Sequence, residues 1–159
     1  MANLDQQALI EIDETSTAVT TDEAAQLKLE TPMWALVESG NGRQLQRTFE
    51  FESYPDVLSF ANRIAQVAQD CNHHPVMTVE PRSVTVHWQT HSLGDVHRND
   101  YIMAAKSDTA YLNWLDESRA NDVVTEASKE SFPASDAPGW VGKTVEEENA
   151  GAVTAENGV

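Results

Sequence analysis

Residues 53–75 read SYPDVLSFANRIAQVAQDCNHHP, and they hold the clearest helical pattern of the chain. Their apolar residues recur at the i, i+3, i+4 spacing of one helical face, which predicts a helix over residues 53–70 that packs against a sheet. Ser53 followed by Asp56 resembles a capping box, and Pro55 is tolerated in the first turn of a helix. The apolar stripe consists of Val57, Phe60, Ala61, Ile64, Val67, Ala68 and Cys71.

A β-hairpin is predicted on each side of this helix. Upstream, Gly40-Asn41-Gly42 is a turn signal, and the strand after it alternates apolar Leu45 and Phe49 with polar residues, as half-buried strands do. Downstream, the turn falls at Pro81-Arg82. The predicted strands are residues 34–38 and 44–51 upstream and residues 76–80 and 83–90 downstream.

Two further helices complete the predicted domain. A short one covers about residues 21–29, and a last one covers residues 99–115. Either Asp95 or His97 caps the last helix. The order α-β-β-α-β-β-α predicts an α+β fold, in which a four-stranded antiparallel sheet has helices packed on one face. The inner face of the last helix is predicted to hold Ile102, Ala105, Leu112 and Leu115.

Acidic residues are concentrated at the two ends of the chain, whose formal net charge is −16. Residues 1–30 hold seven acidic residues and one basic residue, and residues 116–159 hold ten and three. This composition predicts disordered acidic tails over residues 1–20 and 119–159, around one domain at residues 21–118. The acidic balance argues against direct binding to nucleic acids, which takes a basic footprint.

Other features of the sequence predict the state of the cysteine, the cellular location and the oligomeric state. The single cysteine, Cys71, rules out an internal disulfide and is expected to be a buried thiol. No apolar run approaches the ~20 residues of a membrane span, and no signal-peptide pattern opens the chain, so we expect a cytoplasmic protein. A core of about 85 residues buries limited surface, so we expect a homodimer or homotetramer. Ser131–Asp136 is an apolar island of unassigned role in the C-terminal tail.

All five histidines lie between His73 and His97. Histidine gives and takes protons near neutral pH, so positioned histidines serve as general acids and bases. The adjacent His73 and His74, with His91 at the end of the next hairpin and Asp100 just beyond, therefore form a candidate acid/base set.

Three motifs carry a resemblance to a known family. Asn72-His73-His74-Pro75, then Thr90-His91, then Arg98-Asn99-Asp100-Tyr101 resemble the signature of the pterin-4a-carbinolamine dehydratases, also called 4a-hydroxytetrahydrobiopterin dehydratases. Arg47-Thr48-Phe49-Glu50-Phe51 is similar to the same family. The similarity covers roughly residues 22–115 and implies the same α+β fold.

The resemblance implies an activity and a set of roles. The reaction is dehydration of a 4a-hydroxytetrahydropterin to the quinonoid dihydropterin without a metal or other cofactor, which recycles the cofactor of an aromatic amino acid hydroxylase, the implied partner. By resemblance, His73 and His91 are the acid/base pair. His74 binds or orients the substrate, and Asp100 holds a histidine tautomer or a ring N–H. The other residues expected at the pterin substrate are Asn72, Pro75 and Met77.

The sequence departs from the family signature at three places. Gln69 stands where a charged residue is usual four positions before His73, and Met77 stands where some members carry an aromatic residue. Asp95-Val96-His97 replaces the usual Gly-Leu-Thr before the last helix, so the cap of that helix differs. His87 has no counterpart in the signature and is expected on the surface of a strand.

Two alternatives to the dehydratase remain open at this point. One is a non-enzymatic pterin-binding or regulatory dimerisation module with the same fold. The other is a zinc site built from the histidines, against which geometry weighs. His73 and His74 are adjacent and point apart. His87 and His91 are ~13 Å apart along a regular strand, whereas zinc–nitrogen bonds are ~2.1 Å long.

Overall fold

The computed structural model describes residues 2–131, and the side chains of residues 2–122. By its contacts the chain divides into two compact units, residues 1–115 and residues 116–159. The first unit contains a four-stranded sheet in the order β1-β2-β4-β3, with each neighbouring pair antiparallel. Its strands are β1 (Ala35–Ser39), β2 (Gly42–Glu50), β3 (Val76–Glu80) and β4 (Ser83–Trp88).

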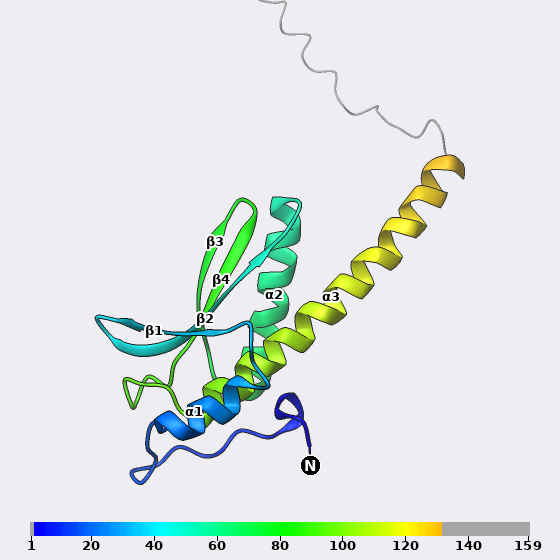
Figure 1. Ribbon diagram of the computed structural model, residues 1–159. Helices are drawn as coiled ribbons and strands as arrows, with labels where there is room; N and C mark the ends of the chain where they lie inside the picture. The colour runs from blue at the N-terminus through cyan, green and yellow to red at the C-terminus, as the bar shows by residue number, and fades with distance from the viewer. Residues whose placement is uncertain (1, 132–159) are drawn as a thin grey trace, which may run out of the picture. The chain divides into compact units, whose positions relative to one another are not determined.

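Helices α1 (Thr21–Lys28), α2 (Tyr54–Cys71) and α3 (Arg98–Ser131) complete the fold. Figure 1 shows α2 and the first turns of α3 against the same face of the sheet. The α+β fold and its element order are therefore confirmed. The Ser53 hydroxyl accepts a hydrogen bond from the Asp56 amide, and Pro55 lies in the first turn, as the sequence predicted for the start of α2.

The core lies between the sheet and these two helices. Alternate residues of the central strands point into it, so that Leu45 and Phe49 of β2 meet Val84, Val86 and Trp88 of β4. Aromatic rings from β2, α2, α3 and the residue after β2 complete the core. The ring centroids of Phe49 and Phe60 lie 4.8 Å apart, and those of Phe51 and Trp114 lie 5.0 Å apart. Such pairs add to the burial of apolar area.

Helix α3 differs from its prediction at its end and in its inner face. It continues past residue 115 to Ser131, because residues 116–131 contain neither Pro nor Gly to end it. Leu112, predicted to face the core, is 61% exposed. Ser107 is a polar residue in the middle of the buried face, so it interrupts the apolar pattern of the helix. Its hydroxyl accepts a hydrogen bond from the buried Trp88 indole. The buried face holds Ile102 and Ala105, as predicted, together with Met103, Ser107, Ala110 and Trp114. Residues 132–136 of the predicted apolar island lie outside the described residues.

Residues 2–20, called the strap below, differ from the disordered tail that their composition predicted. Leu4 and Val19 are only 1% and 4% exposed, and a short 3-10 helix covers Leu4–Gln6. Backbone groups of the strap bond to residues far along the chain. The Ile10 amide donates to the Asn99 side chain, and the Val19 amide donates to the Val96 carbonyl. The average composition of the segment does not reveal that Leu4 and Val19 are buried. It also does not reveal the hydrogen-bond partners, which lie elsewhere in the sequence.

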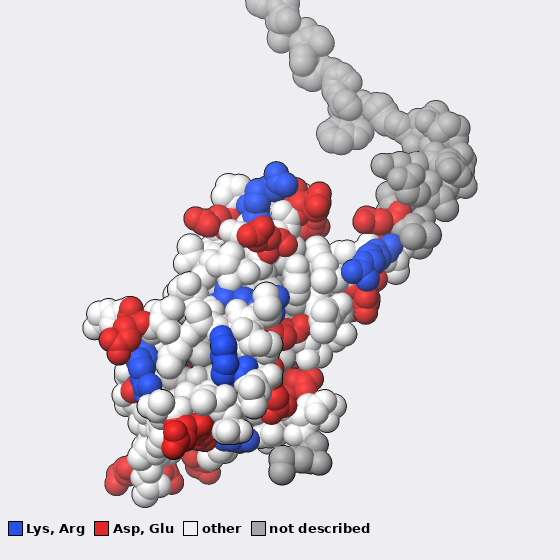
Figure 2. All heavy atoms as spheres, viewed as in Figure 1, with Lys and Arg blue, Asp and Glu red and all other residues white. Residues whose placement is uncertain are grey.

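The surface carries both signs of charge. On the face seen in Figure 2, Lys and Arg lie among Asp and Glu side chains. Among the described residues, no helix is long and apolar enough to cross a membrane.

Candidate active site

The end of α2 presents the paired histidines. Asn72 ends the helix in the left-handed conformation, with φ of 52° and ψ of 41°, and its amide donates to carbonyls of the last turn. Asparagine tolerates this conformation better than most residues. The His73 amide donates to the Ala68 carbonyl at 3.0 Å, which completes the cap. The chain therefore turns sharply at Asn72 and brings His73 to the start of α3.

Asp100 is the hydrogen-bonding centre of the site, and none of it is exposed. Its Oδ1 lies 2.7 Å from His73 Nε2, and its Oδ2 accepts hydrogen bonds from the Thr90 hydroxyl at 2.7 Å and the His97 amide at 2.8 Å. A buried carboxylate is costly unless its oxygens are bonded, and these three donors meet that need. The donors come from the end of α2, the residues after β4 and the start of α3.

His73 is held in one orientation, and its partner Asp100 favours one tautomer. Its ring stacks on the Trp88 indole with 5.7 Å between centroids and 18° between planes, and its side chain is 14% exposed. Because the Asp100 carboxylate accepts a hydrogen bond, Nε2 of the neutral imidazole carries the proton. Nδ1 is then the nitrogen of His73 that is able to take up a second proton.

The cap of α3 is His97, which settles the choice between Asp95 and His97. The Asn99 amide donates to His97 Nδ1 at 3.0 Å, and the His97 amide donates to Asp100. This is a reciprocal capping box in which an imidazole replaces the usual hydroxyl. Asp95 bonds instead to Arg43, 2.7 Å away, and this hydrogen bond holds the pKa of the Asp95 carboxyl below its ordinary value.

His91 belongs to a hollow of about 500 Å³, called the outer-face hollow below. Val86 and Trp88 face the helices, so the residues that alternate with them, His87 and Gln89, face the other side of the sheet. His91 continues this alternation past Thr90. The hollow is lined by Ser39, Asn41, Gln44, Val76, His87, Gln89, His91 and Gly94.

Two close contacts build the wall of the outer-face hollow. The Gln89 side-chain amide donates to the carbonyls of Asn41 and Arg43, both at 2.9 Å, which leaves its Oε1 as an acceptor. Gly42 has a φ of +101°, and a Cβ there would lie 2.0 Å from the Gly94 carbonyl oxygen. The turn between β1 and β2 therefore lies directly against the turn after His91, and only glycine fits this approach.

The other histidines of the sequence have different surroundings. His74 is exposed, and its Nε2 lies 3.2 Å from Gln69 Oε1, so Gln69 contacts His74 and not His73. His87 Nε2 lies 2.8 Å from Gln46 Oε1, while its buried Nδ1 has no hydrogen-bond partner among the described residues.

The structure unites some of the predicted site residues and separates others. His73 and Asp100 meet directly, whereas no hydrogen bond or ring contact among the described residues joins His91 to His73. Met77, predicted at the substrate, packs against the core, and its neighbour Val76 lines the outer-face hollow instead. Successive side chains of a strand point to opposite faces of the sheet, so Val76 and Met77 of β3 face opposite sides. Among the side chains of residues 2–122, no three metal-ligating groups lie together as a metal site requires.

Sequence reasoning missed three residues of this site. Thr90 was noted only as a motif neighbour, and Gln44 and Gln89 were given no part in it. The parity of His87, Gln89 and His91 along the chain was the available signal, because it places all three on the same side of the sheet.

Comparisons with known proteins identify the family of the chain. Residues 17–110, more than half of the chain, match the family described as pterin 4 alpha carbinolamine dehydratase. A protein of Marinobacter nauticus, provisionally named pterin-4-alpha-carbinolamine dehydratase, is 37% identical over 111 residues, which cover 70% of this chain and 100% of the relative. A protein of Chlorobium limicola with the same provisional name is 38% identical over 107 residues, or 67% of this chain and 95% of that one.

The chain therefore belongs to the pterin-4-alpha-carbinolamine dehydratase family, as its motifs indicated. A solved structure from Brucella melitensis, described as a transcriptional coactivator/pterin dehydratase, matches with a TM-score of 0.54 and 24% identity. The match covers 59% of this chain and 98% of that chain, and it shows a shared fold.

Proposed function

We propose that this protein converts a 4a-hydroxytetrahydropterin into the quinonoid dihydropterin and water, and so regenerates the pterin cofactor of an aromatic amino acid hydroxylase. Membership of the family supports the substrate class. The observation that carries the proposal is the buried His73–Asp100 pair, which shares Asp100 with Thr90, the residue next to His91. His73 is therefore bonded to the residue that also bonds Thr90, and His91 is the next residue along the chain.

The reaction needs one acid and one base. The C–O bond at C4a breaks, and the acid protonates the departing oxygen so that it leaves as water. The base takes the proton from N5, and the electrons of that N–H bond form the C4a=N5 double bond. Histidine gives and takes protons near neutral pH, so two suitably positioned histidines supply both functions, each worth ~10²–10⁴-fold in rate.

His73 is suited to the role of base, and His91 to that of acid. When His73 Nδ1 takes the N5 proton, the imidazolium stays hydrogen-bonded to the Asp100 carboxylate, which stabilises the positive charge. His91 is exposed at the rim of the outer-face hollow, where it exchanges protons with solvent. After turnover, exchange with solvent returns both histidines to their starting states.

The outer-face hollow suits the pterin ring in size and polarity and is lined by His91. His73 is not among its lining residues and stacks on Trp88, so the proposal requires the reacting edge of the pterin to extend from the hollow to His73. The volume of the hollow, about 500 Å³, lies in the range of small-molecule sites. The Gln89 Oε1 atom is fixed as an acceptor, and the 2-amino group of a pterin offers it a matching donor. His74 and Asn72 lie at the turn after α2, and we assign them to orientation of the substrate.

A turnover assay tests the proposal. The purified protein, stripped of metal by a chelator, should accelerate breakdown of the 4a-carbinolamine. His73→Ala and His91→Ala should each slow this reaction ~10²-fold or more, and the double mutant should lose less than the product of the two effects if the histidines act as a unit. Circular dichroism and melting curves show whether the variants are folded. Folded variants with wild-type turnover would overturn the assignment of these histidines.

A non-enzymatic pterin-binding or regulatory dimerisation module is the second candidate. The same fold occurs in the Brucella melitensis protein, whose description names both a transcriptional coactivator and a pterin dehydratase. Wild-type protein that binds a pterin in a fluorescence titration but gives no turnover would favour this second role.

A further inference from the structure

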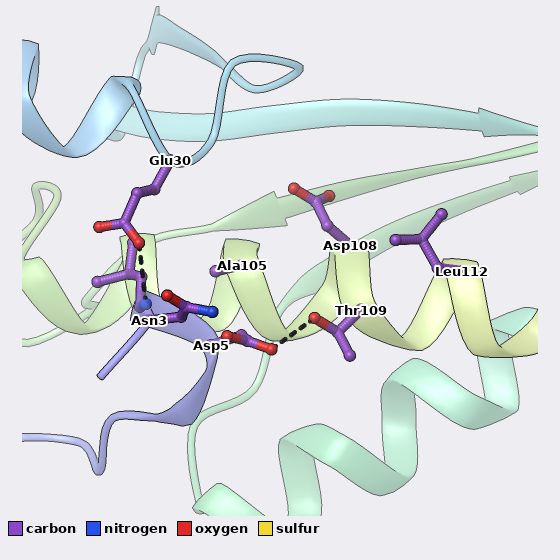
Figure 3. A pocket seen from close by; sticks show the side chains of 8 residues that line it. Asn3, Asp5, Glu30, Ala105, Asp108, Thr109 and Leu112 are labelled. Atoms are coloured by element: carbon purple, nitrogen blue, oxygen red, sulfur yellow. Dashed lines mark hydrogen bonds between the residues drawn. The ribbon is translucent and has the colours of Figure 1, made fainter. Parts of the chain in front are cut away.

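The strap is fastened to α3 at two separate places. At the first, the Thr109 hydroxyl donates to the Asp5 carboxylate at 2.7 Å, and beside it the Leu4 amide donates at 3.1 Å to the carboxylate of Glu30, which follows α1 (Figure 3). The Lys106 ammonium also donates to the Asp5 carbonyl at 2.8 Å. This fastening lies three turns into the helix, away from the histidines.

The second place, called the Asn99 latch below, lies at the start of α3. The Ile10 amide donates to Asn99 Oδ1 at 2.8 Å, and Asn99 Nδ2 donates to the Ile10 carbonyl at 2.7 Å. One side-chain amide therefore bonds both polar groups of one residue, as a neighbouring strand would. Asn99 is 2% exposed, so its amide depends on Ile10 for these bonds.

The Asn99 latch is one residue away from the carboxylate that holds His73. The backbone amide of Asn99 is bonded to the His97 imidazole, and the backbone amide of His97 is bonded to Asp100. The other end of the strap holds the same segment, since the Val19 amide donates to the Val96 carbonyl at 2.9 Å. The strap thus bonds residues on both sides of His97, in the segment that leads into Asp100.

We propose that the strap is a positioning element of the active site, and that the Asn99 latch sets the direction of the Asp100 carboxylate and so the orientation of the His73 imidazole. This inference rests on the proposed function for its catalytic consequence. The segment that matches the family begins at residue 17, so Ile10 lies outside it. None of the strap lines the outer-face hollow, so the strap affects the rate of the chemical step and not the affinity for the substrate.

Two variants of the full chain open the Asn99 latch, and one closely matched variant leaves it closed. Ile10→Pro removes the donor to Asn99, and Asn99→Ala removes both partners of Ile10. Ile10→Ala keeps the peptide group and loses only a side chain that is 48% exposed. The readouts are the nitrogen-15 chemical shifts of the His73 imidazole, which report its tautomer and hydrogen bond, and kcat and KM for the carbinolamine.

Ile10→Pro and Asn99→Ala should both shift the His73 nitrogen resonances and lower kcat about tenfold at unchanged KM. A displacement of 1 Å costs on the order of 10²-fold in rate, and we expect the imidazole to move by less than that. Ile10→Ala should match the wild type in both readouts. If the strap only stabilised the fold, both latch variants would melt earlier but keep the wild-type resonances and kcat, and the inference would be overturned.

The resonances also separate this inference from the proposed function. If the wild type shows no turnover, the proposed function fails, whereas shifted His73 resonances in the latch variants still support the positioning role. If one latch variant does not fold, the other decides. Asn99→Asp is a third variant, which keeps the acceptor for the Ile10 amide and loses the donor to the Ile10 carbonyl.

Discussion

His73 Nε2 lies 2.7 Å from Asp100 Oδ1, although 27 residues separate the two in the sequence. The intervening residues form the β3–β4 hairpin and the loop after it, which return the chain to the end of α2. The contact joins the residue that follows the cap of α2 to the first turn of α3. It is the part of the structure on which the proposed catalysis depends most directly.

Replacing Asp100 by asparagine tests this contact with little change in shape. The asparagine amide puts N–H groups where the carboxylate accepts from Thr90 and His97, and it no longer stabilises a protonated His73. We expect Asp100→Asn to lower kcat by about 10²-fold or more, as loss of a carboxylate that orients a catalytic histidine does. Thr90→Val, which removes one of the three donors, should have a smaller effect. Steady-state kinetics measure both, and wild-type kcat in Asp100→Asn would contradict the role given to this carboxylate.

Replacing Gly42 by alanine tests the wall of the outer-face hollow. The new Cβ would lie 2.0 Å from the Gly94 carbonyl oxygen, on a backbone with φ of +101°. We expect Gly42→Ala to lower the free energy of unfolding by about 1–3 kcal/mol and to raise KM, because one of the two turns has to move. Gly40→Ala is the control, since nothing lies within 4 Å of its Cβ. Equal urea unfolding curves for the two variants would show that the turns are not packed as described.

The ion pair between Arg43 and Asp95 makes the free energy of unfolding depend on pH. Bonding to Arg43 puts the pKa of folded Asp95 below its ordinary 3.8, so its stabilising contribution is present above that pH and is lost as pH falls through the folded pKa. We expect Asp95→Asn to cost about 1 kcal/mol at pH 7, because the pair is partly exposed. The difference from the wild type should shrink at acidic pH below 3.8. Urea unfolding at several pH values measures it, and a difference that does not change with pH would refute the prediction.

Assembly into a homodimer or homotetramer stays a prediction. Strands β1 and β3 are the two edges of the sheet, and Leu36, Val76 and Val79 on them are 41%, 55% and 39% exposed. Edge strands with exposed apolar residues readily pair with another copy of a chain. Sedimentation velocity at micromolar concentration should give a particle larger than one chain. A monomer at that concentration would rule out stable association through these edges.

The sequence by itself determined the elements with a strong local period. The stripe from Val57 to Cys71, with Ser53 as the cap, predicted α2 almost to the residue, and the turn signals predicted both hairpins. The spacing of the histidine motifs also indicated the family, which the comparisons confirm. These features could be predicted because periodicity, capping and turn chemistry act between residues that are close along the chain.

Only the tertiary structure decided which distant groups meet. The Asn99 latch joins residues 89 positions apart, and the composition around Ile10 resembles that of a disordered tail. The same holds for three other contacts, because no local pattern marks their partners. They are the bond of Thr90 to Asp100, the cap that His97 forms on α3, and the bonds of Gln89 to Asn41 and Arg43. A hydrogen bond between distant segments forms because the packed core brings its donor and acceptor together, so it becomes visible only once the sheet and helices have been assembled.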